Sequence, residues 1–209
     1  MGLYFKGKVK ENGMMAVWEL TESESELEKV VPCAESMVGK AKSRRRKKEL
    51  LVVQILITEI FGSDVSLDHH PTGEPFLKNR SDYITISHSH RFVVLLTHPF
   101  LRVGVDIECM DRNFSAVEHK ALSLSEISFL KSGERLRQLA ILWSAKEALY
   151  KFLSIKKIDF AKQIEVESFN LQDYGVLTAQ FIDNNQKSST HLMEYKIFDN
   201  HILVYIFAE

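Results

Sequence analysis

Two acidic residues, Asp106 and Glu108, stand two positions apart in the sequence. Asp106 lies within the apolar stretch from Val103 to Ile107, and Glu108 follows that stretch directly. The alternation of apolar and acidic residues predicts a β-strand that presents both carboxylates on one face. At a separation of roughly 6.6 Å and an effective dielectric constant of about 20, the two charges repel each other by on the order of 2.5 kcal/mol. A bound cation would relieve this repulsion, whereas on a fully solvated face the repulsion would be small.

A third carboxylate, Glu147, follows some forty residues later in the segment 136–153, which contains no Pro or Gly. The apolar residues of this segment recur at a helical period, so it predicts an amphipathic helix with Trp143, Glu147 and Lys151 on one stripe. Taken alone, Glu147 and Lys151 would form an ordinary surface pair worth about 0.2–0.5 kcal/mol. Taken with Asp106 and Glu108, Glu147 offers a third oxygen ligand for a metal ion.

Together the two segments, GVDIE at 104–108 and WSAKEALYK at 143–151, resemble the signature of the 4'-phosphopantetheinyl transferase superfamily. That family combines a (V/I)(G/D)xD(I/V)E strand with a W(S/T)xKE(S/A)xxK helix about forty residues later. The segment 122–130 is similar to the FSxxExxxL element between them, with Glu126 at its acidic position. The match covers both motifs in the expected order and spacing.

The resemblance implies an α+β protein of two similar α+β subdomains with the active site at their interface. We place the subdomains at residues 1–101 and 102–209. It also implies the activity: transfer of the 4'-phosphopantetheine arm of coenzyme A to a serine of an apo acyl or peptidyl carrier protein, with release of adenosine 3',5'-bisphosphate. Without the resemblance, the pattern of elements indicates only a mixed α+β protein.

The resemblance further assigns roles to the acidic and basic residues of the two motifs. Asp106, Glu108 and Glu147 would hold Mg²⁺, a hard cation that prefers carboxylate oxygens. Either Glu147 or a metal-bound water would take the proton of the acceptor serine, which is a weak nucleophile until it is deprotonated. We expect Lys146 and Lys151 to neutralise phosphate charge.

A basic run from Lys40 to Lys48 precedes the apolar helical pattern of residues 49–61. Positive charge at the start of a helix opposes the macrodipole, and an anionic partner would offset that cost. Composition alone favours a solvated charged face or a nucleic-acid patch. The resemblance instead implies contacts with the phosphates of coenzyme A. The candidate residues are Arg44, Arg45, Arg46 and Lys48.

Two further segments resemble donor-binding elements of the family. The stretch Gly73-Glu74-Pro75, in an expected loop over 69–78, is similar to a GKP element, so Gly73 and Pro75 become candidate donor contacts. Glu74 replaces a lysine that contacts a phosphate, and Lys78 or the basic run would have to compensate. Between two strands expected over 83–97, Ser87 and His88 match an SHS element whose hydroxyl and imidazole can both donate to a phosphate.

The chain has 209 residues, of which 45% are hydrophobic and 26% charged, with a formal net charge of −1. This is the composition of an ordinary soluble globular protein, and it gives no general reason to expect nucleic-acid binding. No run approaches the ~18 apolar residues of a membrane span, and the first residues lack the apolar core of a secretory signal. We therefore expect a cytoplasmic, monomeric protein without a membrane partner.

The remaining elements follow from periodicity and turn residues. Strands are expected at 3–9 and 14–20, then a helix that opens near Thr21 and stops near Pro32, and three or four strands within 163–207. Two other functions stay open: a non-catalytic binder of coenzyme A or carrier protein, and a basic nucleic-acid-binding protein, which would leave both signature motifs unexplained. The pathway of the carrier protein is not encoded in these motifs.

Overall fold

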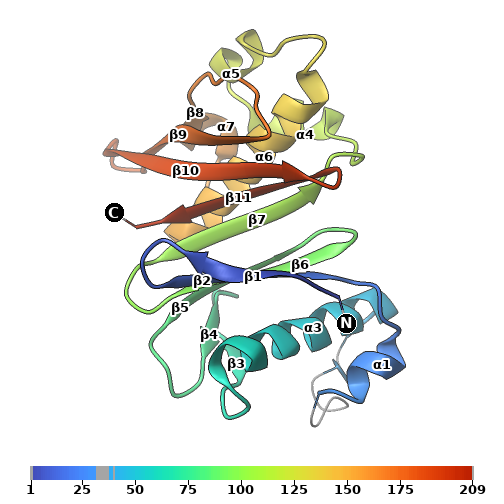
Figure 1. The fold of residues 1–209 in the computed structure, drawn as a ribbon. Helices are drawn as coiled ribbons and strands as arrows, with labels where there is room; N and C mark the ends of the chain where they lie inside the picture. The colour runs from blue at the N-terminus through green and yellow to red at the C-terminus, as the bar shows by residue number, and fades with distance from the viewer. Residues whose placement is uncertain (1, 32–37, 40, 209) are drawn as a thin grey trace. The chain divides into compact units, whose positions relative to one another are not determined.

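The structure is a computed structural model that describes residues 2–31, 38–39 and 41–208 of the chain. It is a mixed α/β structure that divides into two compact units, Met1–Val103 and Gly104–Glu209. Each unit contains a sheet with helices packed on it (Figure 1).

The sheet of the first unit has four strands in the order β1-β2-β6-β5, and all neighbouring pairs are antiparallel. The expected strands at its N-terminal end are confirmed, as are the two strands expected over 83–97. Their bounds are β1 Leu3–Val9, β2 Gly13–Glu19, β5 Tyr83–His88 and β6 Phe92–His98. Strand β6 is buried along its whole length, as its continuous apolar run predicts.

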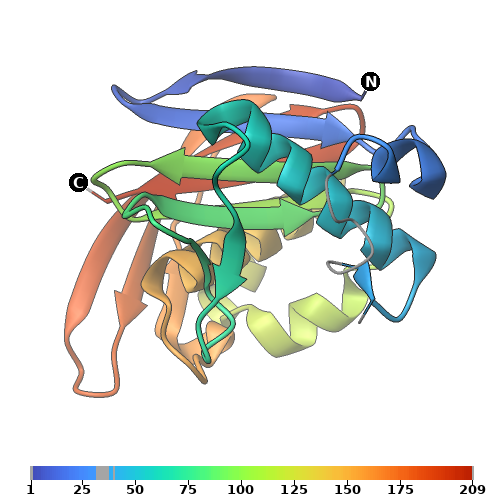
Figure 2. The ribbon, with the colours of Figure 1, turned by 90° about the horizontal axis from the view of Figure 1, so that it is seen from below.

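Helix α3, Arg44–Phe61, lies across this sheet (Figure 2). It begins at Ser43, whose side chain accepts a hydrogen bond from the Arg46 amide, and it ends at Gly62, where φ is +91°. A positive φ suits glycine, which has no Cβ to clash with the backbone. The apolar face of the helix packs into a core with strands β2 and β6. This confirms the helix expected from the pattern over 49–61.

The segment expected as a loop over 69–78 contains a short hairpin instead. Strands β3, Leu67–His69, and β4, Pro75–Leu77, pair antiparallel, with His69 opposite Pro75. Proline is tolerated here because it begins β4, where its missing N–H removes no interior ladder bond. Gly73 lies in the turn with φ at +93°.

The sheet of the second unit has five strands in the order β7-β11-β10-β9-β8. Its bounds are β7 Val103–Cys109, β8 Ile164–Val166, β9 Tyr174–Ile182, β10 Ser188–Phe198 and β11 His201–Phe207. Strand β7 carries the GVDIE motif, and the strands expected within 163–207 are confirmed. Strands β10 and β11 are joined by a turn in which Asp199 and Asn200 both have positive φ.

Helix α6, Arg135–Leu153, packs against strand β11 and confirms the helix expected over 136–153. Its last turn closes at Ser154, which has a left-handed backbone conformation. The helix passes so close to β7 that a Cβ at Gly104 would stand 2.8 Å from the Cβ of Phe152 and would also meet the carbonyl of Ala148. Glycine at this position therefore lets the motif strand approach the motif helix.

Three short helices complete the second unit: α4 Ser115–Ala121, α5 Leu124–Ser128 and α7 Phe160–Gln163. In the first unit, α1, Glu24–Glu28, starts with a capping box formed by Ser23 and Glu26. The expected stop of that helix near Pro32 lies outside the described residues, and α1 ends before it. Among the helices described, none has the length and apolar character needed to cross a bilayer.

Candidate active site

Strand β7 carries Asp106, whose side chain is almost fully buried at 5% exposure. Its Oδ1 accepts a hydrogen bond from the Lys151 Nζ at 2.8 Å. The same ammonium donates to the carbonyl oxygen of Val105 at 3.0 Å. The structure thus brings together the GVDIE strand and the last turns of α6, where Lys151 pairs with the carboxylate of Asp106.

Glu108, two residues further along β7, is held by two other side chains. Its Oε1 accepts from the Trp143 indole Nε1 at 3.0 Å and from the guanidinium of Arg112. The Arg112 guanidinium lies over the Trp143 ring, 5.3 Å from its centroid. Burial raises the pKa of Glu108 and so does the nearby charge of Asp106, while Arg112 opposes the increase. Trp143 is therefore a hydrogen-bond donor at this site as well as a packing side chain.

Glu147, on helix α6, has a strongly raised pKa. Burial, followed by the negative charge of Asp106, raises the pKa of Glu147 to about 7, although Lys151 acts in the opposite direction. A carboxyl group with a pKa near neutrality is populated in both protonation states at working pH. It can therefore accept a proton from a substrate without remaining trapped in either state.

The chemistry of the three carboxylates suits a hard cation. The charge of Asp106 raises the pKa of both Glu108 and Glu147, so the three groups repel one another, and a divalent ion would relieve that repulsion. Within the described part of the chain, however, no three His, Cys, Asp or Glu side chains are arranged as a metal-holding group. The donor set fits Mg²⁺ by its chemistry, while Lys151 and Arg112 occupy oxygens of Asp106 and Glu108.

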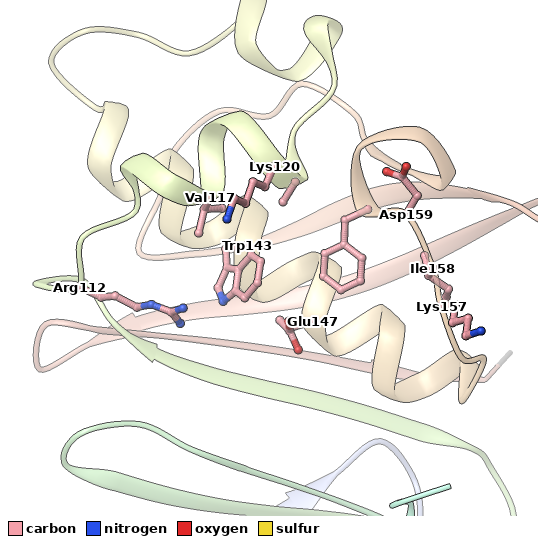
Figure 3. Close-up of a pocket in the computed structure, with 10 residues that line it drawn as sticks. Arg112, Val117, Lys120, Trp143, Glu147, Lys157, Ile158 and Asp159 are labelled. Carbon is pink, nitrogen blue, oxygen red and sulfur yellow. The ribbon is translucent and has the colours of Figure 1, made fainter.

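A pocket of about 740 Å³ opens beside Glu147 (Figure 3). Helix α6 contributes Trp143 and Glu147, and the segment 157–160 lies opposite them. Basic and apolar side chains share the lining. The lining residues are Arg112, Val117, Lys120, Ala121, Trp143, Glu147, Lys157, Ile158, Asp159 and Phe160.

The surroundings of Lys146 contradict the expectation that it neutralises phosphate charge. Its side chain is 0% exposed, and its Nζ donates to the Glu126 carboxylate at 2.7 Å. Three backbone carbonyls complete its surroundings: Ala121 at 2.8 Å, Phe160 at 3.0 Å and Ile164 at 2.7 Å. An ammonium has three donors, and protein oxygens already surround this one. Lys146 is therefore a buried structural residue rather than a phosphate contact.

Glu126, at the acidic position of the intervening motif, is the partner that makes this burial possible. It is 0% exposed and belongs to the capping box of α5, in which its Oε2 accepts from the Ser123 amide at 2.8 Å. Its Oε1 accepts from the Val166 amide in β8 at 2.9 Å. The Lys146 and Glu126 pair thus connects α6 with α4, α5, α7 and β8.

The expected phosphate-binding residues of the first unit gather around the start of α3. His88, at the end of β5, lies 3.0 Å from the Arg46 guanidinium through its Nε2. Arg45 donates from Nη2 to the carbonyl of Ser89 at 2.7 Å. Ser87 is buried at 5% exposure. The structure therefore brings together three of the predicted residues, Arg45, Arg46 and His88.

Glu49, which the sequence reasoning did not single out, lies beneath this cluster. It is 3% exposed and pairs with Arg45 at 3.0 Å and with Arg46 at 3.1 Å. The His88 Nδ1 lies 3.5 Å from its Oε1. Spacings of three and four residues from Arg46 and Arg45 place Glu49 on their side of the helix, and this signal was present in the sequence.

The other basic candidates have separate surroundings. Arg44 is exposed, and Lys48 donates to the carbonyl of Leu20 at 3.4 Å. Lys47 pairs with Glu24 at 3.0 Å. Lys40, at the start of the basic run, lies outside the described residues.

Gly73 and Glu74 lie in the turn of the β3-β4 hairpin and Pro75 begins β4; the Glu74 carbonyl accepts from the His70 amide. Lys78, proposed to compensate for Glu74, forms an ion pair with Asp68 at 3.1 Å.

Arg112 is a second residue that sequence reasoning missed. Its position four residues after Glu108 is a weak signal, because the chain leaves the strand between them.

Comparison with protein families gives a match to a family model described as the 4'-phosphopantetheinyl transferase superfamily, over residues 102–206. This is about half of the chain, and it contains strand β7, helix α6 and the three carboxylates. A comparison with curated proteins gives no match.

Proposed function

The chain belongs to the 4'-phosphopantetheinyl transferase superfamily, and we propose that it transfers the 4'-phosphopantetheine arm of coenzyme A to a serine of an apo acyl or peptidyl carrier protein. The serine oxygen would form a bond to the phosphorus that bears the pantetheine arm. The bond from that phosphorus to the bridging pyrophosphate oxygen would break, and adenosine 3',5'-bisphosphate would leave. Phosphopantetheinyl transfer is the activity of the superfamily, whereas the acceptor is part of our proposal.

The observation that carries the proposal is Glu147. It lies on the wall of the pocket, and burial raises its pKa to about 7. A group of this kind can accept the serine proton near neutral pH, and it can release the proton afterwards. Asp106 keeps the pKa of Glu147 raised through its charge, so the two carboxylates of different motifs act as one unit.

Mg²⁺ is the cofactor that we propose, with Asp106, Glu108 and Glu147 as the residues that would hold it. When bound, it would neutralise charge on the pyrophosphate of the donor and on the leaving phosphate. Lys151 already compensates the charge of Asp106, and Arg112 that of Glu108. These two cationic side chains are therefore available to contact donor phosphates when the carboxylates bind an ion.

The first unit supplies the charges that suit the phosphates of coenzyme A. Arg45, Arg46 and His88 are about half exposed, at 50%, 46% and 39% of their side chains. Guanidinium groups bind phosphate through paired hydrogen bonds, which favours Arg45 and Arg46 over the neighbouring lysines as contacts.

The test is incubation with coenzyme A, Mg²⁺ and a panel of apo carrier proteins, followed by intact-mass measurement of each carrier. We expect a mass gain equal to one phosphopantetheine on at least one carrier, and loss of that gain with Glu147→Gln. Glu165→Gln, which removes an exposed carboxylate of the same unit, is the matched control and should transfer normally. Binding of coenzyme A without any mass gain would instead favour a non-catalytic binder.

A further inference from the structure

Two guanidinium groups and the imidazole of His88, all in the first unit, converge on one buried carboxylate, that of Glu49. We propose that Glu49 is a positioning residue, which together with His88 holds Arg45 and Arg46 in the orientation that binds the phosphates of the donor. The inference rests on the proposed function, because it assumes that this cluster binds coenzyme A. It adds a residue that contacts no phosphate itself and acts through its neighbours.

The hydrogen bonds divide the Glu49 carboxylate between its partners. Oε1 accepts from the Arg45 Nε, and Oε2 accepts from the Arg46 Nη1. Arg45 also donates from Nη2 to the carbonyl of Ser89, a residue buried at 4% exposure in the turn after β5. Glu49 and Ser89 together therefore fix the plane of the Arg45 guanidinium relative to the end of strand β5.

The contact with Arg46 indicates which ring nitrogen of a neutral His88 carries the proton. A guanidinium has no acceptor, so the contact between Arg46 Nη1 and His88 Nε2 requires Nε2 to accept. The proton of a neutral His88 is then on Nδ1, the nitrogen that faces the Glu49 Oε1 at 3.5 Å. Glu49 thus favours the arrangement in which Arg46 and His88 are linked side by side.

The two guanidinium groups keep capacity for a ligand in this arrangement. Each is about half exposed, whereas Glu49 is 3% exposed and is covered by its partners. Of the five N–H donors of Arg46, those on Nη1 face Glu49 and His88, and the described contacts leave Nε and Nη2 to solvent or ligand. The carboxylate therefore orders the cluster from below, and its exposed side stays cationic.

Electrostatics and positioning predict opposite effects of removing this carboxylate. If charge alone mattered, Glu49→Gln would remove a negative charge from beneath the cluster and strengthen phosphate binding. If Glu49 positions the cluster, the amide would weaken binding, because its NH₂ group meets the N–H donors of an arginine. Ordering Arg45 and Arg46 would then have to occur when the donor binds, which lowers affinity.

The experiment is calorimetric titration of the full chain with coenzyme A and with adenosine 3',5'-bisphosphate. We expect Glu49→Gln to weaken both affinities by about tenfold or more, and to raise the KM for coenzyme A without changing the KM for the carrier protein. Glu59→Gln is the matched control, because Glu59 is a half-exposed glutamate of the same helix paired with Lys6. It should leave the affinity unchanged. Unchanged or tighter binding by Glu49→Gln would overturn the inference.

Two further variants keep the outcome interpretable. Glu49→Asp keeps the charge but shortens the side chain. A positioning role therefore predicts weaker binding of coenzyme A, whereas pure electrostatics predicts no change in affinity. Urea unfolding of each variant checks that the unit is folded. Arg46→Gln tests the underlying assumption: if it leaves the affinity for coenzyme A unchanged, the cluster is not the donor site and both proposals for it fail. If Arg46→Gln weakens binding and neither Glu49 variant does, the positioning role alone is wrong.

Discussion

Replacing Lys146 by methionine should be among the most destabilising changes in the second unit. Methionine keeps an unbranched chain of similar length, but it removes an ammonium that four oxygens surround at 2.7–3.0 Å. Glu126 would be left as a charge in a site with 0% exposure, and three carbonyls would each lose a donor. Removing one partner of a buried ion pair costs about 3–5 kcal/mol, because the other charge stays buried without compensation.

This loss is a large fraction of the free energy of unfolding of about 5–15 kcal/mol that a domain typically has. With a denaturant slope of about 1–3 kcal/mol per molar, the urea midpoint should fall by roughly 1–5 M. Adding Glu126→Gln to Lys146→Met removes the orphan charge, but the amide NH₂ group then faces the N–H of Ser123 or Val166, so the double variant should recover only part of the loss, about 1 kcal/mol. Lys162→Met is the control, because its side chain is 82% exposed and pairs with Asp159 at the surface. Its effect should be below about 1 kcal/mol.

The assay is urea unfolding followed by far-ultraviolet circular dichroism for the wild type and these three variants. A loss below about 1 kcal/mol for Lys146→Met would refute the structural role of this lysine. So would a double variant that is less stable than Lys146→Met, because the damage would then not come from an uncompensated Glu126 charge.

Three further predictions concern single residues of the two units. The pKa of Glu147 is raised from 4.5 to about 7, so the unfolded chain loses this proton at lower pH than the folded protein. The free energy of unfolding of the metal-free protein should therefore decrease between those values as pH rises. Urea unfolding at several pH values should show this decrease, and Glu147→Gln should remove the part that Glu147 contributes. Arg112→Gln removes a cation that lowers the pKa of Glu108, so the Glu108 pKa should increase in a carbon-detected NMR titration; a decrease would contradict the contact. Glu74→Lys should tighten coenzyme A binding in calorimetry if the β3-β4 turn faces a donor phosphate, and an unchanged affinity would remove this turn from the donor site.

The elements were predictable where periodicity is strong and the residues are consistent with it. Helices α3 and α6 follow from apolar faces without internal Pro or Gly, and β6 follows from a continuous apolar run. The β3-β4 hairpin was missed because Pro75 and Gly73 read as loop residues. Strands of three residues leave too few positions for alternation to be visible.

The site was predictable in its residue types, but less so in its contacts. The spacing placed Trp143 and Lys151 on one stripe with Glu147, but their hydrogen bonds to Glu108 and Asp106 are seen only in the structure. Lys146 adjoins Glu147 in sequence, yet neighbouring helical residues point about 100° apart, so the two cannot share a face. No pattern in the sequence reveals that Glu126 and three carbonyls enclose the Lys146 ammonium, because these groups come from four other segments.

The contacts of Glu49 could have been predicted from its spacing to Arg45 and Arg46, but the total charge of the segment does not reveal them. A run of basic residues at a helix start was expected to need an external anion to offset its cost. The structure supplies a carboxylate from within the helix, one turn after Arg45 and Arg46. Seen as i, i+3 and i, i+4 pairs rather than as a total charge, the segment already contains its own partner.

Glu147 is the group that we propose to accept the serine proton during transfer. The most direct test is a single-turnover reaction with excess enzyme, coenzyme A, Mg²⁺ and the apo form of a carrier that gained mass in the panel, in which adenosine 3',5'-bisphosphate and holo-carrier are measured together. We predict one bisphosphate released for each carrier converted, at a rate that falls by at least about 100-fold in Glu147→Gln. Bisphosphate release without carrier conversion, or a Glu147→Gln variant with the wild-type rate, would contradict the account.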